Sequence, residues 1–204
     1  MIVGIVNFKM GNINSVSNAL NYLGCENKII NTLEDFENIT HIILPGVGSY
    51  KDAINKLKKL GWEKAIKNFS SDSTKSLFGI CVGMQILSTY GYEYGKSNGL
   101  NIIEGYVDRM DKQGCILKLP HIGWNNIKII NNSLITENIS NDSNFYFINS
   151  YSFKLMNLNT LIATTDYGIE FPSIINRQNI FGTQFHPEKS SKAGIQILKN
   201  FINA

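Results

Sequence analysis

The chain has 204 residues, of which 43% are hydrophobic and 17% are charged, and its formal net charge is only +3. This composition supports a folded core and excludes a disordered chain, and the length favours one domain over residues 1–204 rather than two. The small positive excess is spread along the chain, so it gives no reason to expect nucleic-acid or membrane partners. No segment approaches the roughly 20 apolar residues of a membrane span, and the first residues do not resemble a signal peptide.

The cysteines are few and widely spaced: Cys25, Cys81 and Cys115. An odd number at such spacing predicts reduced thiols in the cytoplasm rather than a disulfide framework. The sequence contains no CxxC pair and no cluster of cysteine and histidine, so we expect no zinc or other metal site.

The first half of the chain alternates short apolar runs with segments of helical periodicity. Expected strands cover residues 2–6, 26–30, 41–44 and 76–80, and expected helices cover 13–23, a segment capped by Ser49 that runs through Leu60, and 82–90. Such alternation predicts a parallel sheet that is covered by helices on both faces.

From about residue 102 the pattern changes to short strands joined by Asn, Gly or Asp turns. The expected strands cover 102–107, 115–119, 127–130, 145–148, 161–165, 173–176 and 180–185, and a helix over 191–202 closes the chain. The expected fold class is therefore α/β: a mostly parallel central sheet with flanking helices, plus an added antiparallel sheet.

The segment Gly79-Ile80-Cys81-Val82-Gly83 lies where an expected strand meets an expected helix. It is the cysteine form of a nucleophile elbow, in which flanking glycines permit a tight turn and the helix N-terminus favours a thiolate. The N–H group of Val82 is then positioned to bind an oxyanion. The pentapeptide alone leaves a second interpretation open, in which Cys81 is a small buried hydrophobe between packing glycines.

His186 follows the last expected strand and precedes Pro187, which restricts it to an extended conformation. Because residues i and i+2 of an extended segment point to the same side, Glu188 can reach the imidazole and orient it. Cysteine, histidine and carboxylate together match the logic of a catalytic triad. Taken alone, this segment could equally be an ordinary strand exit followed by a solvated charge.

The two motifs together, residues 79–85 and 184–188, resemble those of class I glutamine amidotransferases. Three further segments, 44–48, 119–125 and 185–190, are similar to one subfamily, the glutaminase subunits of imidazole glycerol phosphate synthase. The order and spacing agree from Ile2 to the terminal helix. The resemblance implies the flavodoxin-like α/β fold of this class.

The resemblance also implies a role for each matching position. Cys81 is the expected nucleophile, His186 the acid/base and Glu188 its orienting carboxylate. Matching positions further supply the oxyanion side (Val47, Gly48 and Val82), the glutamine site (Gln85, Glu93, Ser150 and Tyr151) and the partner interface near the ammonia exit (His121, Trp124 and Asn125).

The implied reaction is hydrolysis of the glutamine side-chain amide through a cysteine thioester, without metal or organic cofactor. The implied partner is a (β/α)₈-barrel synthase, which forms a heterodimer with the chain and uses the ammonia to make imidazole glycerol phosphate and AICAR in histidine biosynthesis. Ammonium is a poor nucleophile, so a dry path for ammonia and coupling of turnover to the partner are expected.

One position departs from the pattern of this family. Asn149, in Phe147-Ile148-Asn149-Ser150-Tyr151, stands where the family usually has histidine. Asparagine cannot become a cation, although it can still donate and accept hydrogen bonds. This change leaves open an alternative in which the same glutaminase supplies ammonia to another acceptor, such as an amidated surface sugar. A non-catalytic subunit and a cysteine peptidase fit less well, because the triad is complete and the other motifs agree.

Overall fold

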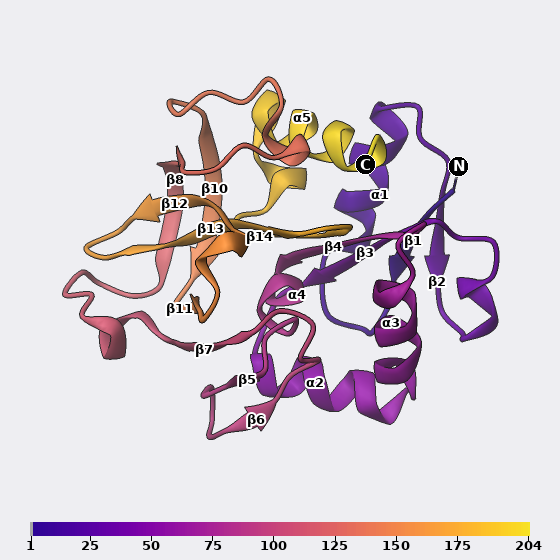
Figure 1. Ribbon diagram of the computed structural model, residues 1–204, viewed down its shortest axis with the longest axis horizontal. Coiled ribbons are helices and arrows are strands. Elements are labelled where there is room, and N and C mark those ends of the chain that lie inside the picture. Colours follow the sequence, from indigo (N-terminus) through magenta and orange to yellow (C-terminus); the bar gives the residue numbers. More distant parts are fainter. Residues whose placement is uncertain (1) are drawn as a thin grey trace.

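A central sheet of eight strands forms the frame of the computed structural model, which describes residues 2–204 (Figure 1). Across the sheet the strands are β2 (Asn27–Ile30), β1 (Val3–Val6), β3 (His41–Gly46), β4 (Ser76–Cys81), β14 (Ile180–Thr183), β13 (Glu170–Arg177), β12 (Leu161–Asp166) and β9 (Lys128–Ile129). Neighbours from β2 to β14 are parallel, whereas β13, β12 and β9 pair antiparallel. The expected α/β fold class is confirmed.

Helices cover both faces of this sheet, as the alternation predicted. α1 (Ile13–Tyr22) and α5 (Ser191–Ile202) lie on one face, and α2 (Tyr50–Lys59), α3 (Trp62–Ser71) and α4 (Val82–Gln85) lie on the other (Figure 1). Every residue of β1, β3 and β4 is consequently buried. Strands covered on both sides read as continuous apolar runs because no face remains for polar side chains.

The added antiparallel part is confirmed as two smaller sheets beside the central one. One sheet pairs β8 (His121–Asn126) with β10 (Asn144–Asn149). The other contains β11 (Tyr151–Leu155), β7 (Gly105–Arg109), β5 (Tyr90–Gly91) and β6 (Ser97–Asn98). All its pairings are antiparallel except that of β5 with β7, which is parallel.

One expected helix is wrong in its bounds, and one helix was not expected. The helix capped by Ser49 ends at Lys59, and Gly61 adopts φ +72, a left-handed conformation that turns the chain into the unexpected helix α3. The helix expected over 82–90 ends at Gln85. The N–H groups of Leu87 and Ser88 bond three residues back instead of four, and Tyr90 joins β5.

The strand expected over 115–119 is absent, since no neighbouring strand pairs with this segment. Cys115 instead closes a turn, its N–H bonding to the carbonyl of Met110 and its thiol to the carbonyl of Tyr167. Other expected strands shift. β7 begins at Gly105 and β14 ends at Thr183, and the strand expected over 127–130 shortens to β9. Strands β5, β6, β8 and β11 were not expected.

The buried apolar side chains, from Val3 to Phe201, form one continuous cluster. This fits the expected single domain over residues 1–204, which stays a prediction. Within residues 2–204, no helix is both long enough and apolar enough to traverse a lipid bilayer.

Candidate active site

Three neighbouring parallel strands end at one edge of the sheet and carry the predicted site residues to it. In the register of β3 and β4, Gly46 lies opposite Cys81, so Val47 and Gly48 follow directly beyond that edge. In the register of β4 and β14, Thr183 lies opposite Ile80, and His186 follows three residues later. Residues that are 105 positions apart therefore meet because ligand sites form at the carboxyl ends of parallel strands.

The turn at Cys81 has the strained geometry of a nucleophile elbow. Its backbone adopts φ 53 and ψ −110, a region that residues with side chains rarely occupy. Close contacts with backbone atoms require glycine at both Gly79 and Gly83. A Cβ atom at Gly79 would lie 2.6 Å from the carbonyl oxygen of Gly83, and one at Gly83 would overlap the carbonyl oxygen of Leu44. The turn therefore holds Cys81 at the N-terminus of α4.

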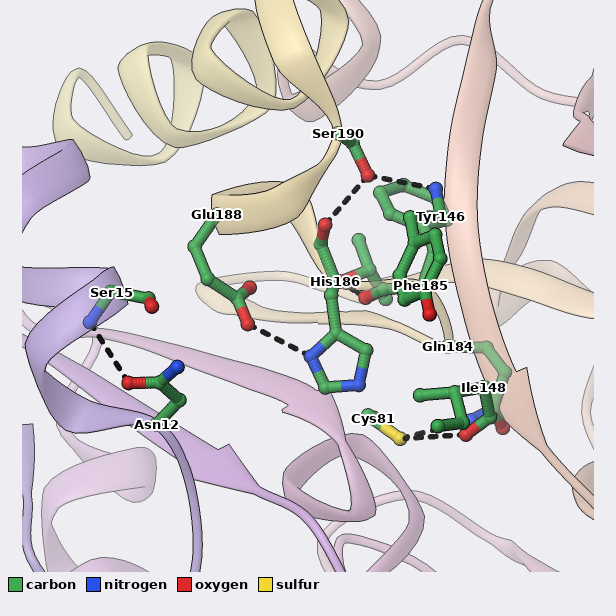
Figure 2. A network of polar contacts seen from close by, with 11 residues as sticks. Asn12, Ser15, Cys81, Tyr146, Ile148, Gln184, Phe185, His186, Glu188 and Ser190 are labelled. Carbon is green, nitrogen blue, oxygen red and sulfur yellow. Dashed lines mark hydrogen bonds and ion pairs between the residues drawn. The ribbon is translucent and has the colours of Figure 1, made fainter. Parts of the chain in front are cut away.

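His186 and Glu188 form a buried pair, with Nδ1 of the imidazole 2.8 Å from Oε1 of the carboxylate (Figure 2). Their side chains are only 2% and 3% exposed. The hydroxyl of Ser190 fixes this turn against β10, because it donates to the carbonyl of His186 at 2.6 Å and accepts from the N–H of Tyr146 at 2.9 Å. The extended segment thus places the carboxylate beside the ring, as the i, i+2 spacing predicted.

The other ring nitrogen of His186, Nε2, lies on the side of Cys81 (Figure 2). It is buried and has no hydrogen-bond partner among residues 2–204. Burial opposes protonation of the ring. The negative charges of Cys81, as a thiolate, and of Glu188 together outweigh burial and raise the pKa of His186 to about 10. The arrangement therefore favours an imidazolium beside the sulfur of Cys81.

Two further groups touch the sulfur of Cys81. The carbonyl oxygen of Ile148 lies 3.9 Å from Sγ and can accept from the thiol. Nε2 of Gln184 lies 3.7 Å from Sγ and can donate to it. Gln184 is completely buried, and its Oε1 accepts from Nε2 of Gln85 at 3.0 Å.

A cavity of about 480 Å³ opens in front of Cys81. Its walls contain most of the residues that the sequence singled out. These are Val47, Gly48, Cys81, Val82, Gln85, Glu93, Ser150, Tyr151 and His186, joined by Tyr94, Arg109, Pro120, Ile148, Asn149 and Lys189. Glu188 is not in the wall and lies behind the imidazole. The cavity is large enough for one small substrate, and it places that substrate against sulfur and imidazole together.

Two of the predicted glutamine-binding residues already make contacts within the chain. The Glu93 carboxylate accepts from the N–H of Tyr50 at 2.6 Å, at the N-terminus of α2. Burial raises the pKa of Glu93, although this hydrogen bond opposes the shift. Nε2 of Gln85 donates to the carbonyl of Tyr151 at 3.0 Å, so it fixes the backbone of the cavity wall.

The predicted interface residues differ in exposure. Trp124 is 55% exposed and lies on the outer face of β8. His121 is buried on the inner face and stacks on Tyr167 with ring centroids 4.1 Å apart, so its side chain offers no surface to a partner in this conformation. Asn125 is half-buried and donates to the carbonyl of Asp166 at 2.8 Å.

Sequence reasoning gave no role to several residues of the site, among them Lys189, Gln184 and Arg109. Lys189 and Gln184 lie within the quoted histidine motif, so the motif itself was the available signal. Arg109 had no signal in the sequence, because only the pairing of β7 with β11 sets it opposite Tyr151. Within residues 2–204, no three side chains among His, Cys, Asp and Glu are grouped so that they could hold a metal ion.

The chain belongs to the family described as Glutamine amidotransferase class-I, which matches residues 4–204. Within this class, it is similar to proteins named imidazole glycerol phosphate synthase subunit HisH. It is 41% identical to that of Pelagibacter ubique (strain HTCC1062), with 100% of both chains covered. It is 40% identical to that of Caldanaerobacter subterraneus subsp. tengcongensis, covering 98% of this chain and 97% of the relative. The resemblance stated from the motifs is confirmed.

Solved structures agree with the fold. A structure described as a glutamine amidotransferase superposes with a TM-score of 0.79, covering 100% of this chain and 98% of its own, at 19% identity. PurLQS from Thermotoga maritima contains a chain that superposes with a TM-score of 0.72, covering 99% and 97%, at 17% identity. At such identities the likeness shows the fold alone.

Proposed function

We propose that this chain is the glutaminase subunit of an imidazole glycerol phosphate synthase. It hydrolyses glutamine to glutamate and ammonia and passes the ammonia to a (β/α)₈-barrel synthase subunit, which makes imidazole glycerol phosphate and AICAR in histidine biosynthesis. The observation that carries the chemistry is that Cys81 and His186 line one cavity and that Glu188 holds the imidazole from behind. The pathway rests on relatives named imidazole glycerol phosphate synthase subunit HisH that match over nearly the whole chain.

In the proposed mechanism, the thiolate of Cys81 attacks the carboxamide carbon of glutamine. The imidazolium of His186 then gives its proton to the departing nitrogen, so the C–N bond breaks and ammonia leaves a glutamyl thioester. His186, now neutral, takes a proton from water, which attacks the thioester. The C–S bond breaks, glutamate leaves and the thiolate returns. Glu188 holds Nδ1 throughout, so Nε2 is the nitrogen that exchanges protons.

The tetrahedral intermediates carry an oxyanion that needs hydrogen-bond donors. The N–H of Val82 opens α4 directly beside the sulfur, and Val47 and Gly48 line the cavity opposite it. Losing one such donor costs about 3–4 kcal/mol in a known hydrolase, so a small movement of this loop can silence turnover. Val47 is 40% exposed, so a bound partner can reach this loop.

The charges of the cavity suit a free amino acid. Glu93 offers a carboxylate to the α-ammonium group of glutamine, and Arg109 and Lys189 offer positive charge to its α-carboxylate. Ser150 and Tyr151 supply backbone groups to the same wall. Gln85 holds that wall in place through the carbonyl of Tyr151.

The proposed partner binds over an apolar surface beside the cavity, which we call the mouth face: Val47, Ile122, Trp124 and Ile148. All four side chains are at least 40% exposed. Ile122 lies directly opposite Ile148 in the pairing of β8 with β10, and Val47 and Ile148 also line the cavity. Exposed apolar side chains gathered around a cavity mark a binding surface, and closure by a partner would keep ammonia away from water.

The alternative acceptor is not favoured by these relatives, which share the histidine-pathway name. Asn149 remains unusual, because its Oδ1 is buried without a hydrogen-bond partner among residues 2–204. The heterodimer, the ammonia channel and the cytoplasmic location stay predictions.

The test is glutamine hydrolysis by the chain alone and with its barrel subunit loaded with ligand. We expect weak turnover alone, strong turnover in the complex, and none above background for Cys81→Ala. Cys115→Ala is the matched control, because it also removes a buried thiol but one that lies outside the cavity. Full turnover by the isolated chain would contradict gating by the partner, and an active Cys81→Ala enzyme would refute the mechanism.

A further inference from the structure

We propose that Gln184 is a positioning residue for the thiolate: its side-chain amide donates to the Cys81 sulfur and, through Gln85, links that sulfur to the backbone of the substrate cavity. The inference rests on the proposed function only in taking Cys81 as the nucleophile. Its evidence is a continuous chain of contacts from Tyr151 to the sulfur.

The direction of these hydrogen bonds is set at one end. The carbonyl of Tyr151 can only accept, so Gln85 must present Nε2 to it, at 3.0 Å. The same Nε2 lies 3.0 Å from Gln184, which must then present its oxygen Oε1. Nε2 of Gln184 is consequently the end that faces Sγ of Cys81, at 3.7 Å. The carbonyl of Tyr151 thus fixes the orientation of both amides, so that Gln184 presents a donor and not an acceptor to the sulfur.

The sheet holds this donor in place. Because Thr183, the last residue of β14, lies opposite Ile80, the residue that follows the strand, Gln184, falls beside Cys81. Gln184 is 0% exposed, and its backbone N–H bonds to the carbonyl of Ser173 at 2.9 Å. A buried amide with both ends engaged cannot rotate freely, so it acts as a fixed dipole rather than as a solvent-like group.

The sulfur has different partners in its two protonation states. A neutral thiol can donate to the carbonyl of Ile148, whereas a thiolate can only accept, and Gln184 donates to it. Such a donor favours the charged form. It also favours breakdown of the thioester, because the departing sulfur becomes a thiolate again. Gln184 therefore assists both attack and release without contacting the substrate.

The test measures alkylation of Cys81 by iodoacetamide against pH on the full chain, with Cys81→Ala as the blank for the other thiols. Gln184→Met keeps the length of the side chain but removes the donor. We expect the pH midpoint of alkylation to rise by about one unit, with a loss of rate of about tenfold at pH 7. The matched control is Thr183→Val, which removes from the adjacent residue a buried hydroxyl that donates to the carbonyl of Phe185. We expect the pH midpoint of alkylation in Thr183→Val to stay unchanged.

A purely structural role for Gln184 would lower the thermal midpoint of Gln184→Met and leave its alkylation midpoint where it is. That result overturns the proposal. Should Gln184→Met fail to fold, Gln184→Glu serves instead. It keeps the acceptor for Gln85 but sets a second carboxyl oxygen against the sulfur. We then expect the same rise of the alkylation midpoint, and no change is again the overturning result.

Steady-state kinetics separate this inference from the proposed function. For Gln184→Met in the complex, we expect kcat for glutamine hydrolysis to fall by about tenfold and KM to stay within about twofold. An equal rise of KM would place Gln184 in substrate binding and overturn a role at the sulfur. If the unaltered chain shows no glutaminase activity, the proposed function fails. The alkylation profile still decides whether Gln184 acts on Cys81.

Discussion

At the scale of single residues, the site depends on opposed effects on one imidazole. His186 is 2% exposed, and such burial alone would keep its ring neutral. The charge of Cys81 and the Glu188 carboxylate reverse this preference and raise the pKa of His186 to about 10. Glu188 is held next to the ring by the local turn, whereas Cys81 comes from another strand. The electrostatics of the site therefore depend on a contact made by the fold.

Replacing the thiol tests this balance. Cys81→Ala removes the largest of the charges that raise the pKa of His186, so the lowering of this pKa by burial dominates. We expect the imidazole of His186 to be neutral at pH 8 in this variant, whereas in the unaltered chain it is protonated. NMR titration of the ring C–H signals measures this difference. Equal midpoints in the two proteins would contradict the assigned cause.

The same shift gives a pH dependence of stability. The folded-state pKa is raised from 6.5 to about 10, so the stabilisation is fully present below pH 6.5 and is lost as pH rises through about 10. Denaturant unfolding across this range should show the loss for the unaltered chain and a flatter profile for Cys81→Ala.

The substitution Glu188→Gln tests whether Glu188 orients the His186 ring, because glutamine has nearly the same shape as glutamate. The amide can present either a donor or an acceptor to Nδ1, so the tautomer of His186 is no longer fixed. We expect kcat to fall by about 10²–10⁴-fold, the range of general acid–base catalysis, with little change of KM. Glu137→Gln, at a carboxylate outside the cavity, is the control, and a Glu188→Gln enzyme with normal kcat would remove Glu188 from the mechanism.

At the scale of elements, the elbow exists because strand and helix approach closely. Gly83 belongs to α4, yet its Cα faces the backbone of β3 rather than solvent. An alanine is normally better than glycine within a helix by about 1 kcal/mol. Here the added Cβ meets the carbonyl oxygen of Leu44, and backbone cannot yield as a side chain can. This steric contact therefore outweighs helix propensity, so an alanine at Gly83 destabilises the fold.

We expect Gly83→Ala to lower the free energy of unfolding by about 3 kcal/mol, the upper range for overpacking, and to abolish glutaminase activity. Gly61→Ala is the control. It lies in open space at φ +72, so only its left-handed conformation is penalised, by about 1–2 kcal/mol, and activity is retained. Denaturant unfolding measures both, and a stabilised Gly83→Ala protein would contradict the crowding.

At the scale of the whole molecule, the smaller sheets bring a second strand system to the cavity. β10 ends at Asn149 and β11 begins at Tyr151, so one chain segment links the mouth face to the glutamine wall. Ile148 belongs to both, since its side chain is 40% exposed and its carbonyl lies 3.9 Å from the Cys81 sulfur. A partner that presses on the mouth face can therefore reach the nucleophile through a single residue.

Trp124→Ala should weaken association with the barrel subunit by about thirtyfold or more, because buried tryptophans dominate interface energies. Glutaminase turnover of the isolated chain should not change, since Trp124 does not line the cavity. Leu158→Ala is the control, an apolar side chain that is 68% exposed and lies outside the mouth face. Calorimetric titration gives the affinities, and equal values for the two variants would remove Trp124 from the interface.

Local patterns predicted much of this fold. The terminal helix was expected over 191–202 and occupies Ser191–Ile202, and the buried strands of the parallel sheet were each found within a few residues. The apolar run 115–119 failed as a strand, because no neighbouring strand pairs with it and its side chains Ile116 and Leu117 stay 92% and 45% exposed. The expected helix stopped at Leu60, so helix α3 was missed, although its buried residues Trp62, Ile66 and Phe69 have helical spacing.

By itself, the sequence determined the two local patterns on which the proposed chemistry depends: a cysteine between spaced glycines, and a histidine two residues before a glutamate. Their backbone requirements are local too. Only the tertiary structure decided that Arg109 faces Tyr151, that His121 is buried, and that Gln184 meets the sulfur. The physical reason is strand register. Pairing joins residues of unrelated position in the chain, and it depends on the packing of the whole molecule rather than on any short segment.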